Sequence, residues 1–221
     1  MQNQNINYVE GATASPEKLK WLENHLPSDP GRALDLGCGA GLYSKWLVQR
    51  GWKVEALDLN EPPPIPGAQT RKHNLEEGIP FPDRSFNLIL VWDVLEHLVH
   101  EKQAWEELAR VLQAGGSLIG SVPHSADQRL HPYNLTFKHH IDKTHQREYS
   151  TFDLEKKLRE VGLNSVQWCL KGPVSPQVIR EFISFKVLRG FTTLLLGLMK
   201  RIGLLRPGEL YADIFFAAHK N

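Results

Sequence analysis

The chain has 221 residues, of which 41% are hydrophobic, and 26 basic side chains nearly balance 25 acidic ones for a net charge of +1. This length fits one large domain, and the near-neutral charge argues against a broad nucleic-acid-binding surface. Two distant cysteines form no disulfide or zinc pattern, the polar N-terminus has no signal-peptide core, and no apolar stretch is long enough to span a membrane, so we expect a cytoplasmic protein.

The first predicted element is a helix near the N-terminus. Ser15 and Pro16 form a typical helix start, with a capping hydroxyl followed by proline at the first helical position. Leu19, Leu22 and Leu26 recur on one face, so the helix is expected to run to about Leu26.

Strands and helices then alternate along the chain. Strands are predicted at 32–36, 53–58, 69–73, 86–92 and 117–122, and helices at 41–50 and about 100–113. A further helix is predicted from Ser150 to Gly162, followed by strands at 163–170 and 211–218. Because the strand at 86–92 is almost continuously apolar, the pattern favours a parallel sheet with helices on both faces.

Three glycines at alternate positions connect the first of these strands to its helix. Gly37, Gly39 and Gly41 would expose backbone amides and a helix N-terminus to a ligand. The third glycine comes one residue too early for a dinucleotide fingerprint. Asp35 lies two residues before the first glycine, which favours a cationic ligand over a pyrophosphate.

The second strand ends in another carboxylate, Asp58. A carboxylate in this position can accept hydrogen bonds from both hydroxyls of a ribose. Neither Leu59 nor Asn60 supplies an arginine for a 2′-phosphate. The predicted ligand is therefore a nucleoside with a free ribose.

Several motifs follow one another in a fixed order: Asp35–Gly41, Asp58, residues 79–89, Val94–Leu98 and residues 108–116. Together they resemble class I S-adenosylmethionine-dependent methyltransferases of the type 11, small-molecule group. The resemblance covers residues 30–123 and continues more weakly to about 164. It implies an α/β fold: a Rossmann-like, doubly wound, mostly parallel seven-stranded sheet with an antiparallel last strand and helices on both faces. The family normally joins the last two strands by a short turn, whereas here about 38 residues intervene, so we also expect a helical insertion before the last strand.

Together with the chain length, the resemblance leads us to expect a single methyltransferase domain over residues 1–221. Its parts would be an N-terminal helix and cap (1–30), a cofactor-binding core (31–123), an active-site loop (124–149) and a helical insertion (172–209).

S-adenosylmethionine is the cofactor that the resemblance implies. The implied contacts are Asp35, Gly37, Cys38, Gly39, Gly41, Asp58, Leu59, Asn74, Leu75, Trp92 and Asp93. Asp35 would hold the amino-acid end of the cofactor, or instead act as a helix cap or buried ion-pair partner. Asn74 replaces the usual aspartate near the adenine amino group. Trp92 either completes the core or forms an aromatic wall near the sulfonium.

Two histidines are candidates for the general base that takes a proton from the methyl acceptor. The preferred one is His145. It lies in a short sequence motif with Arg147 and Tyr149 that resembles a motif of the family. The other is His97, which alternatively forms a structural pair with Glu96. His140, Asp142 and His145 could converge on a metal, but their spacing matches no established ligand pattern, so no metal is predicted.

Residues 182–206 of the insertion combine basic and apolar residues without an acidic one. Three roles stay open for them: core helices or a homodimer contact, a peripheral contact with anionic lipid at the inner membrane face, or a lid over an apolar substrate.

The expected activity is transfer of a methyl group from S-adenosylmethionine to an oxygen, with nitrogen as second choice. The acceptor would be a small molecule, a sugar or a lipid-linked precursor. The alternatives are an RNA or protein methyltransferase and a non-catalytic cofactor-binding scaffold. Nucleic acid is disfavoured as a partner because the basic residues concentrate only in the apolar insertion.

Overall fold

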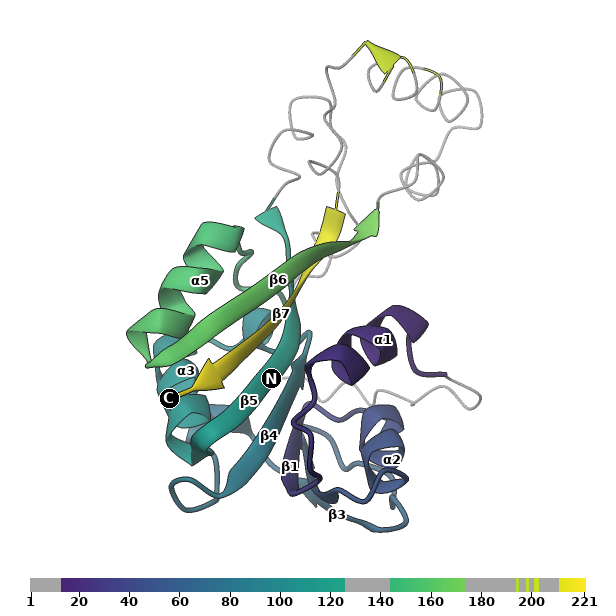
Figure 1. Cartoon of the computed structure of the whole chain (residues 1–221), viewed down its shortest axis with the longest axis vertical. Helices are drawn as coiled ribbons and strands as arrows, with labels where there is room; N and C mark the ends of the chain where they lie inside the picture. Colours follow the sequence, from purple (N-terminus) through teal and green to yellow (C-terminus); the bar gives the residue numbers. More distant parts are fainter. Residues whose placement is uncertain (1–12, 126–143, 174–193, 195–197, 199–200, 203–210) are drawn as a thin grey trace.

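The computed structural model describes residues 13–125, 144–173, 194, 198, 201–202 and 211–221 (Figure 1). Its seven strands form one sheet in the order β3-β2-β1-β4-β5-β7-β6. β7 runs antiparallel between β5 and β6, whereas the other paired strands are parallel. The strands are β1 (Arg32–Leu36), β2 (Lys53–Asp58), β3 (Ala68–Lys72), β4 (Phe86–Trp92), β5 (Leu112–Pro123), β6 (Leu163–Pro173) and β7 (Tyr211–Lys220). The predicted fold class is confirmed.

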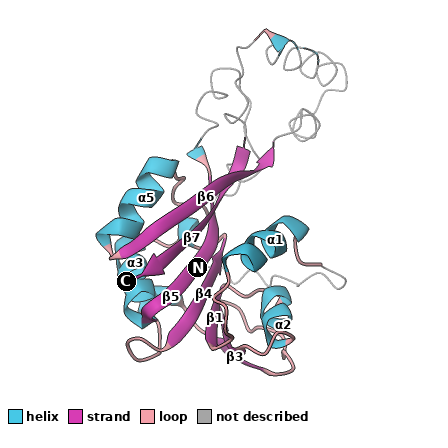
Figure 2. Ribbon diagram, in the orientation of Figure 1, coloured by secondary structure: helices cyan, strands magenta, loops and turns pink. Residues whose placement is uncertain are grey.

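Helices cover both faces of this sheet (Figure 2). On one face α1 and α2 contribute Leu22 and Leu47 to a core shared with β1, β2 and β4. On the other face α3 and α5 contribute Trp105 and Leu158 to a second core. The helices are α1 (Pro16–His25), α2 (Leu42–Val48), α3 (Glu101–Val111) and α5 (Thr151–Glu160), with short 3₁₀ turns η1 (Leu75–Glu77) and η2 (Leu95–His97).

The helix starts follow the capping residues that the sequence indicates. The Ser15 hydroxyl accepts a hydrogen bond from Lys18 N at 3.5 Å, at the start of α1. The Ser150 hydroxyl accepts one from Asp153 N at 3.0 Å, at the start of α5. Each bond satisfies a backbone donor that the first helical turn leaves without a partner.

One strand differs clearly from its predicted extent. β5 begins at Leu112, five residues before the predicted start at 117. Leu112 pairs with Phe86, and the register then shifts before Ser117 pairs with Leu88. Gly115 and Gly116 lie in this irregular part of the strand. In a sequence, glycines usually indicate a turn or a bulge, so the pattern predicts a strand only from 117.

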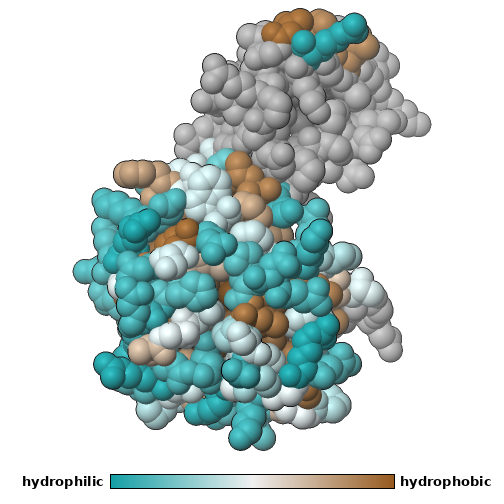
Figure 3. Space-filling view, in the orientation of Figure 1, coloured by the Kyte–Doolittle hydropathy of each residue, from teal (hydrophilic) through white to brown (hydrophobic). Residues whose placement is uncertain are grey.

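Two predicted parts fall largely outside the described residues. They are residues 126–143 of the active-site loop and most of the insertion, including nearly all of 182–206. On the face shown in Figure 3, the described residues are mostly hydrophilic, with small hydrophobic areas between them. Among the described residues, no helix has the length and apolarity needed to cross a bilayer.

Candidate active site

The glycine turn between β1 and α2 has a backbone that only glycine fits. Gly37, Gly39 and Gly41 have φ values of 68°, 53° and 71°. A Cβ on Gly37 would lie 2.3 Å from a methyl group of Val94, and one on Gly41 would lie 2.2 Å from Ile65. The turn therefore presents bare backbone at the carboxyl end of β1.

Asp58, at the carboxyl end of β2, closes this turn from the side. Its Oδ2 accepts a hydrogen bond from Gly39 N, and its Oδ1 accepts one from Asn60 N, both at 2.9 Å. The carboxylate is thus held in one orientation, which suits it to accept a hydrogen bond from a ligand hydroxyl. Beside it Leu59 is 63% exposed and offers an apolar surface at the rim. This arrangement fits the ribose and base of a nucleoside.

Asp35 lies beneath the turn and is only 1% exposed. Its Oδ2 accepts a hydrogen bond of 2.6 Å from the Ser44 hydroxyl in the first turn of α2. Burial raises the pKa of Asp35 to about 6, and the nearby Asp58 adds to the shift while Ser44 opposes it. The thiol of Cys38 is also buried, which raises its pKa. In this structure Asp35 is a buried partner of the helix start, and its contact with the cofactor stays a prediction.

The segment after β3 contains Asn74 and Leu75. Asn74 caps η1, because its Oδ1 accepts a hydrogen bond of 3.1 Å from Glu76 N. Leu75 packs against the core. The side-chain oxygen of Asn74 is the atom predicted to bind the adenine amino group. It already accepts one hydrogen bond and has one further lone pair.

Trp92 at the end of β4 is packed into the core and is 7% exposed. Its ring lies 5.6 Å from that of Tyr43 and 5.7 Å from that of Phe215. The ammonium of Lys18 lies 5.3 Å from its ring centroid. Of the two predicted roles for Trp92, completing the core matches these contacts, and the aromatic wall for a sulfonium stays a prediction.

Asp93, the next residue, has a left-handed backbone with φ 53°. Its Oδ2 accepts a hydrogen bond of 2.5 Å from Lys18 Nζ, and its Oδ1 accepts one from the Ser121 hydroxyl. These bonds tie α1 to the carboxyl ends of β4 and β5. Sequence reasoning did not identify Lys18, because a lysine on an amphipathic helix gives no sign of a distant partner.

Glu96, His97 and His145 form a cluster just beyond β4. One donor atom from each lies within 4.8 Å of the others. The two imidazole rings are 4.6 Å apart at an interplanar angle of 75°. Nδ1 of His97 also shares a hydrogen bond of 2.9 Å with the Thr144 hydroxyl. The structure thus brings together both histidines predicted as the base, and it adds Glu96, which sequence reasoning considered only as a structural neighbour.

Residues 144–149 are fixed to η2 through the backbone. Gln146 N donates a hydrogen bond of 2.7 Å to the Glu96 carbonyl. The Arg147 guanidinium donates to the carbonyls of Leu95, at 3.1 Å, and Leu98. His145 is therefore held near His97 by the contacts of Gln146 and Arg147, which follow it, and by the side-chain contact of Thr144, which precedes it. Arg147 thus donates hydrogen bonds to carbonyl groups at the turn that carries His97.

The comparisons with known proteins agree with this geometry. A family model described as a methyltransferase domain matches residues 13–167. The chain belongs to this methyltransferase family.

Relatives of the methyltransferase support this assignment. A protein named ubiquinone biosynthesis O-methyltransferase from Nitrosococcus oceani is 26% identical over 183 residues, which cover 74% of this chain and 71% of that protein. A protein of the same name from Stutzerimonas stutzeri is 25% identical over 120 residues, 48% of this chain and 50% of that protein. In the second case the chain spans only half the length of its relative.

Solved structures show the same fold. A methyltransferase from Bacillus halodurans superposes with a TM-score of 0.65 at 16% identity, covering 93% of this chain and 99% of the other. An S-adenosylmethionine-dependent methyltransferase from Archaeoglobus fulgidus gives 0.63 at 16% identity, with 92% of each chain covered.

The methyltransferase is an enzyme, and S-adenosylmethionine is its cofactor, as the sequence motifs indicated. The residues of the glycine turn fit this molecule, because a ribose needs the oriented carboxylate of Asp58 and a close backbone approach needs the bare glycines. Asp35 and Asp58 also give this edge an excess of negative charge that suits a sulfonium.

The buried Asp35 predicts an unusual pH dependence of folding. Its pKa is raised from 3.8 to about 6 in the folded state, so the unfolded chain releases this proton first as the pH rises. The folded methyltransferase therefore loses on the order of 2–3 kcal/mol of stability between about pH 4 and 6.5 through this group. Asp35→Asn will remove that loss, measured as the difference in urea unfolding free energy across a pH series without cofactor. Asp29→Asn, at an exposed site, is the control, and an unchanged slope in Asp35→Asn would contradict the assignment.

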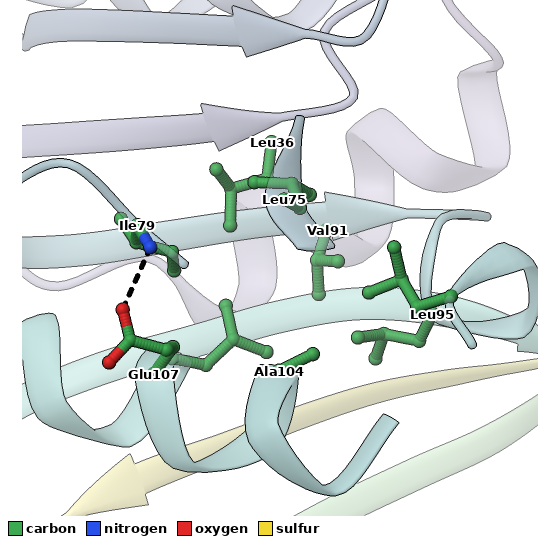
Figure 4. A pocket seen from close by; sticks show the side chains of 9 residues that line it. Leu36, Leu75, Ile79, Val91, Leu95, Ala104 and Glu107 are labelled. Carbon is green, nitrogen blue, oxygen red and sulfur yellow. Dashed lines mark hydrogen bonds between the residues drawn. The ribbon is translucent and has the colours of Figure 1, made fainter. Parts of the chain in front are cut away.

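The apolar pocket on the α3 face of the sheet is a different feature (Figure 4). Aliphatic side chains from β1, β4, η1, η2 and α3 line it, and Glu107 is its polar member. The carboxylate of Glu107 already accepts hydrogen bonds from Ile79 N at 2.7 Å and from Arg110. Because Glu107 is the only polar side chain among the described residues that line it, this pocket fits a gap in core packing rather than an acceptor site.

Proposed function

We propose that the enzyme transfers the methyl group of S-adenosylmethionine to an oxygen atom of a small-molecule, sugar or lipid-linked acceptor. The observation that carries this proposal is the cluster of Glu96, His97 and His145 beside the end of β4. A hydroxyl acceptor must lose a proton, and imidazole groups are suited to take it near neutral pH. The relatives named O-methyltransferases support the choice of oxygen.

The bound cofactor supplies an electrophilic methyl group on a positively charged sulfur. Asp58 and the glycine turn bind and orient the nucleoside end. Lys18, by its ion pair with Asp93, holds α1 against the strand ends next to the site. His145 or His97 removes the acceptor proton as the oxygen attacks. Much of the rate comes from aligning the acceptor with the methyl group and sulfur.

A panel of acceptors tests the proposal. Purified enzyme is incubated with S-adenosylmethionine and, in separate reactions, with phenols, catechols, sugars, small amines, RNA and a protein extract. We expect S-adenosylhomocysteine to form with a hydroxyl-bearing small molecule and the product to carry an O-methyl group. Turnover on RNA or protein alone would favour the second candidate activity, and tight cofactor binding without turnover on any class would favour a scaffold.

Contact with anionic lipid, or with a second copy of the chain, through residues 182–206 stays a prediction. It is supported by the basic and apolar composition of that segment, which lies almost entirely outside the described residues.

A further inference from the structure

Glu96 is a carboxylate in an unusual place. The residue is 1% exposed, and its Oε2 has no hydrogen-bond partner among the residues that the structure describes. Its position is set by the main chain, because it lies in η2 and its carbonyl accepts the hydrogen bond from Gln146 N. A charged carboxylate in such surroundings is costly unless a cation stands next to it.

The fixed charges around Glu96 do not supply that cation. Burial, followed by the nearby Asp93, raises the pKa of Glu96 to about 8, and Asp213 on β7 acts in the same direction. Lys18 on α1 lowers it, but the ammonium of Lys18 is already bound to Asp93. The other titratable groups near Glu96 in the described residues are the two imidazoles of the cluster and the phenol of Tyr149, whose pKa Glu96 helps to raise.

We propose that Glu96 is a positioning residue for the general base, and that its carboxylate holds the imidazolium formed when His145 or His97 takes the acceptor proton. This inference rests on the proposed function. The structure supports it through the spacing of at most 4.8 Å among the three donor atoms and the burial of Glu96. Because the pKa of Glu96 is raised to about 8, the side chain stays largely neutral near pH 7 until a neighbouring imidazole takes up a proton. The carboxylate and the imidazolium then stabilise each other across this distance.

The step balances in protons and electrons. The O–H bond of the acceptor breaks, and its proton forms an N–H bond on the imidazole. The oxygen lone pair forms the new O–C bond, and the electrons of the breaking S–C bond return to sulfur, which becomes neutral. The imidazolium then faces the Glu96 carboxylate and later releases its proton to water, which restores the base.

The hydrogen bond of His97 agrees with this proton transfer. Its Nδ1 forms a hydrogen bond with the Thr144 hydroxyl, so Nε2 is the ring nitrogen that we assign to proton exchange. The edge-to-face contact between the two rings, at 4.6 Å, lets either one respond to the same carboxylate. Glu96 therefore acts on a pair of histidines rather than on a single one.

Glu96→Gln tests the inference, because it removes the ionisable carboxyl group and retains the shape. Histidine signals are followed by NMR in a pH titration and assigned with His97→Gln and His145→Gln. We expect the titration midpoint of at least one of these rings to fall by about one pH unit or more in Glu96→Gln. Glu96→Asp, which keeps the charge, should move it much less. Glu107→Gln, at a carboxylate on α3 bound by Arg110, is the matched control and should leave both rings unchanged.

The same variants are read by kinetics once an acceptor is known. In the pH profile of kcat for Glu96→Gln, the rise on the acidic side should shift to lower pH. The maximal kcat should fall by about 10- to 100-fold. The affinity for S-adenosylhomocysteine should stay the same. The titration needs no turnover, so a failure to find an acceptor would leave this inference testable.

Two results would overturn the role of Glu96. One is a pair of histidine titrations that Glu96→Gln does not move, in a variant whose thermal melt shows that it is folded. The other is inactivation by a chelator with recovery on adding a divalent metal, because the three side chains would then hold a metal ion rather than a shared proton.

Discussion

Asp58→Ala will weaken binding of S-adenosylhomocysteine by at least about 100-fold, as measured by isothermal titration calorimetry. Hydrogen bonds to a charged acceptor are each worth about 1.5–3 kcal/mol, and the carboxylate can accept two from the ribose. The variant also leaves the amide groups of Gly39 and Asn60 without their acceptor, which loosens the glycine turn.

Asp58→Asn separates these two effects. Its amide oxygen can still accept one backbone hydrogen bond, but it has lost the negative charge and one acceptor. We expect an intermediate affinity and a nearly normal melting temperature. If Asp58→Ala binds the nucleoside as tightly as the parent enzyme does, the ribose contact assigned to Asp58 is wrong.

His145→Ala will reduce kcat by about 100-fold or more and leave cofactor affinity unchanged. A positioned general base typically contributes about 100- to 10,000-fold, and His145 lies in the cluster next to Glu96 rather than in the glycine turn. The measurement is steady-state kinetics on an acceptor found in the panel, combined with calorimetry.

His97→Ala is the comparison for this experiment. Because the two rings are 4.6 Å apart, one can partly replace the other, and the double variant should lose more activity than either single one. Full activity in His145→Ala with loss in His97→Ala would move the base to His97. Full activity in the double variant would show that the acceptor loses its proton without help from either histidine.

The glycine turn and Asp58 could be predicted from the sequence because their signals are local. Gly37 and Gly41 stand at positions where the backbone has positive φ and a side chain would collide with Val94 or Ile65. Asp58 ends a strand that must lie next to β1, so its place at the sheet edge follows from the alternation of strands and helices.

The ion pair of Lys18 with Asp93 could not be predicted in the same way, because its partners are 75 residues apart. The same holds for the cluster at η2, which depends on how residues 144–149 return to the sheet. Glu96 and His97 are adjacent in the sequence, but nothing local indicates that His145 joins them. Contacts between distant segments arise from packing, and a single sequence carries no direct record of it.

The chain just before residues 126–143 meets the chain shortly after them at the carboxyl end of β5. Ser125 N donates a hydrogen bond of 2.9 Å to the Tyr149 carbonyl, and Tyr149 N donates one of 3.0 Å to the Pro123 carbonyl. A connection closed at such a point can change in length at little entropic cost. We propose that residues 124–149 help to form the acceptor site. Exchange of this segment between related enzymes, with junctions next to 124 and 149, should then change the acceptor preference and leave the nucleoside site intact.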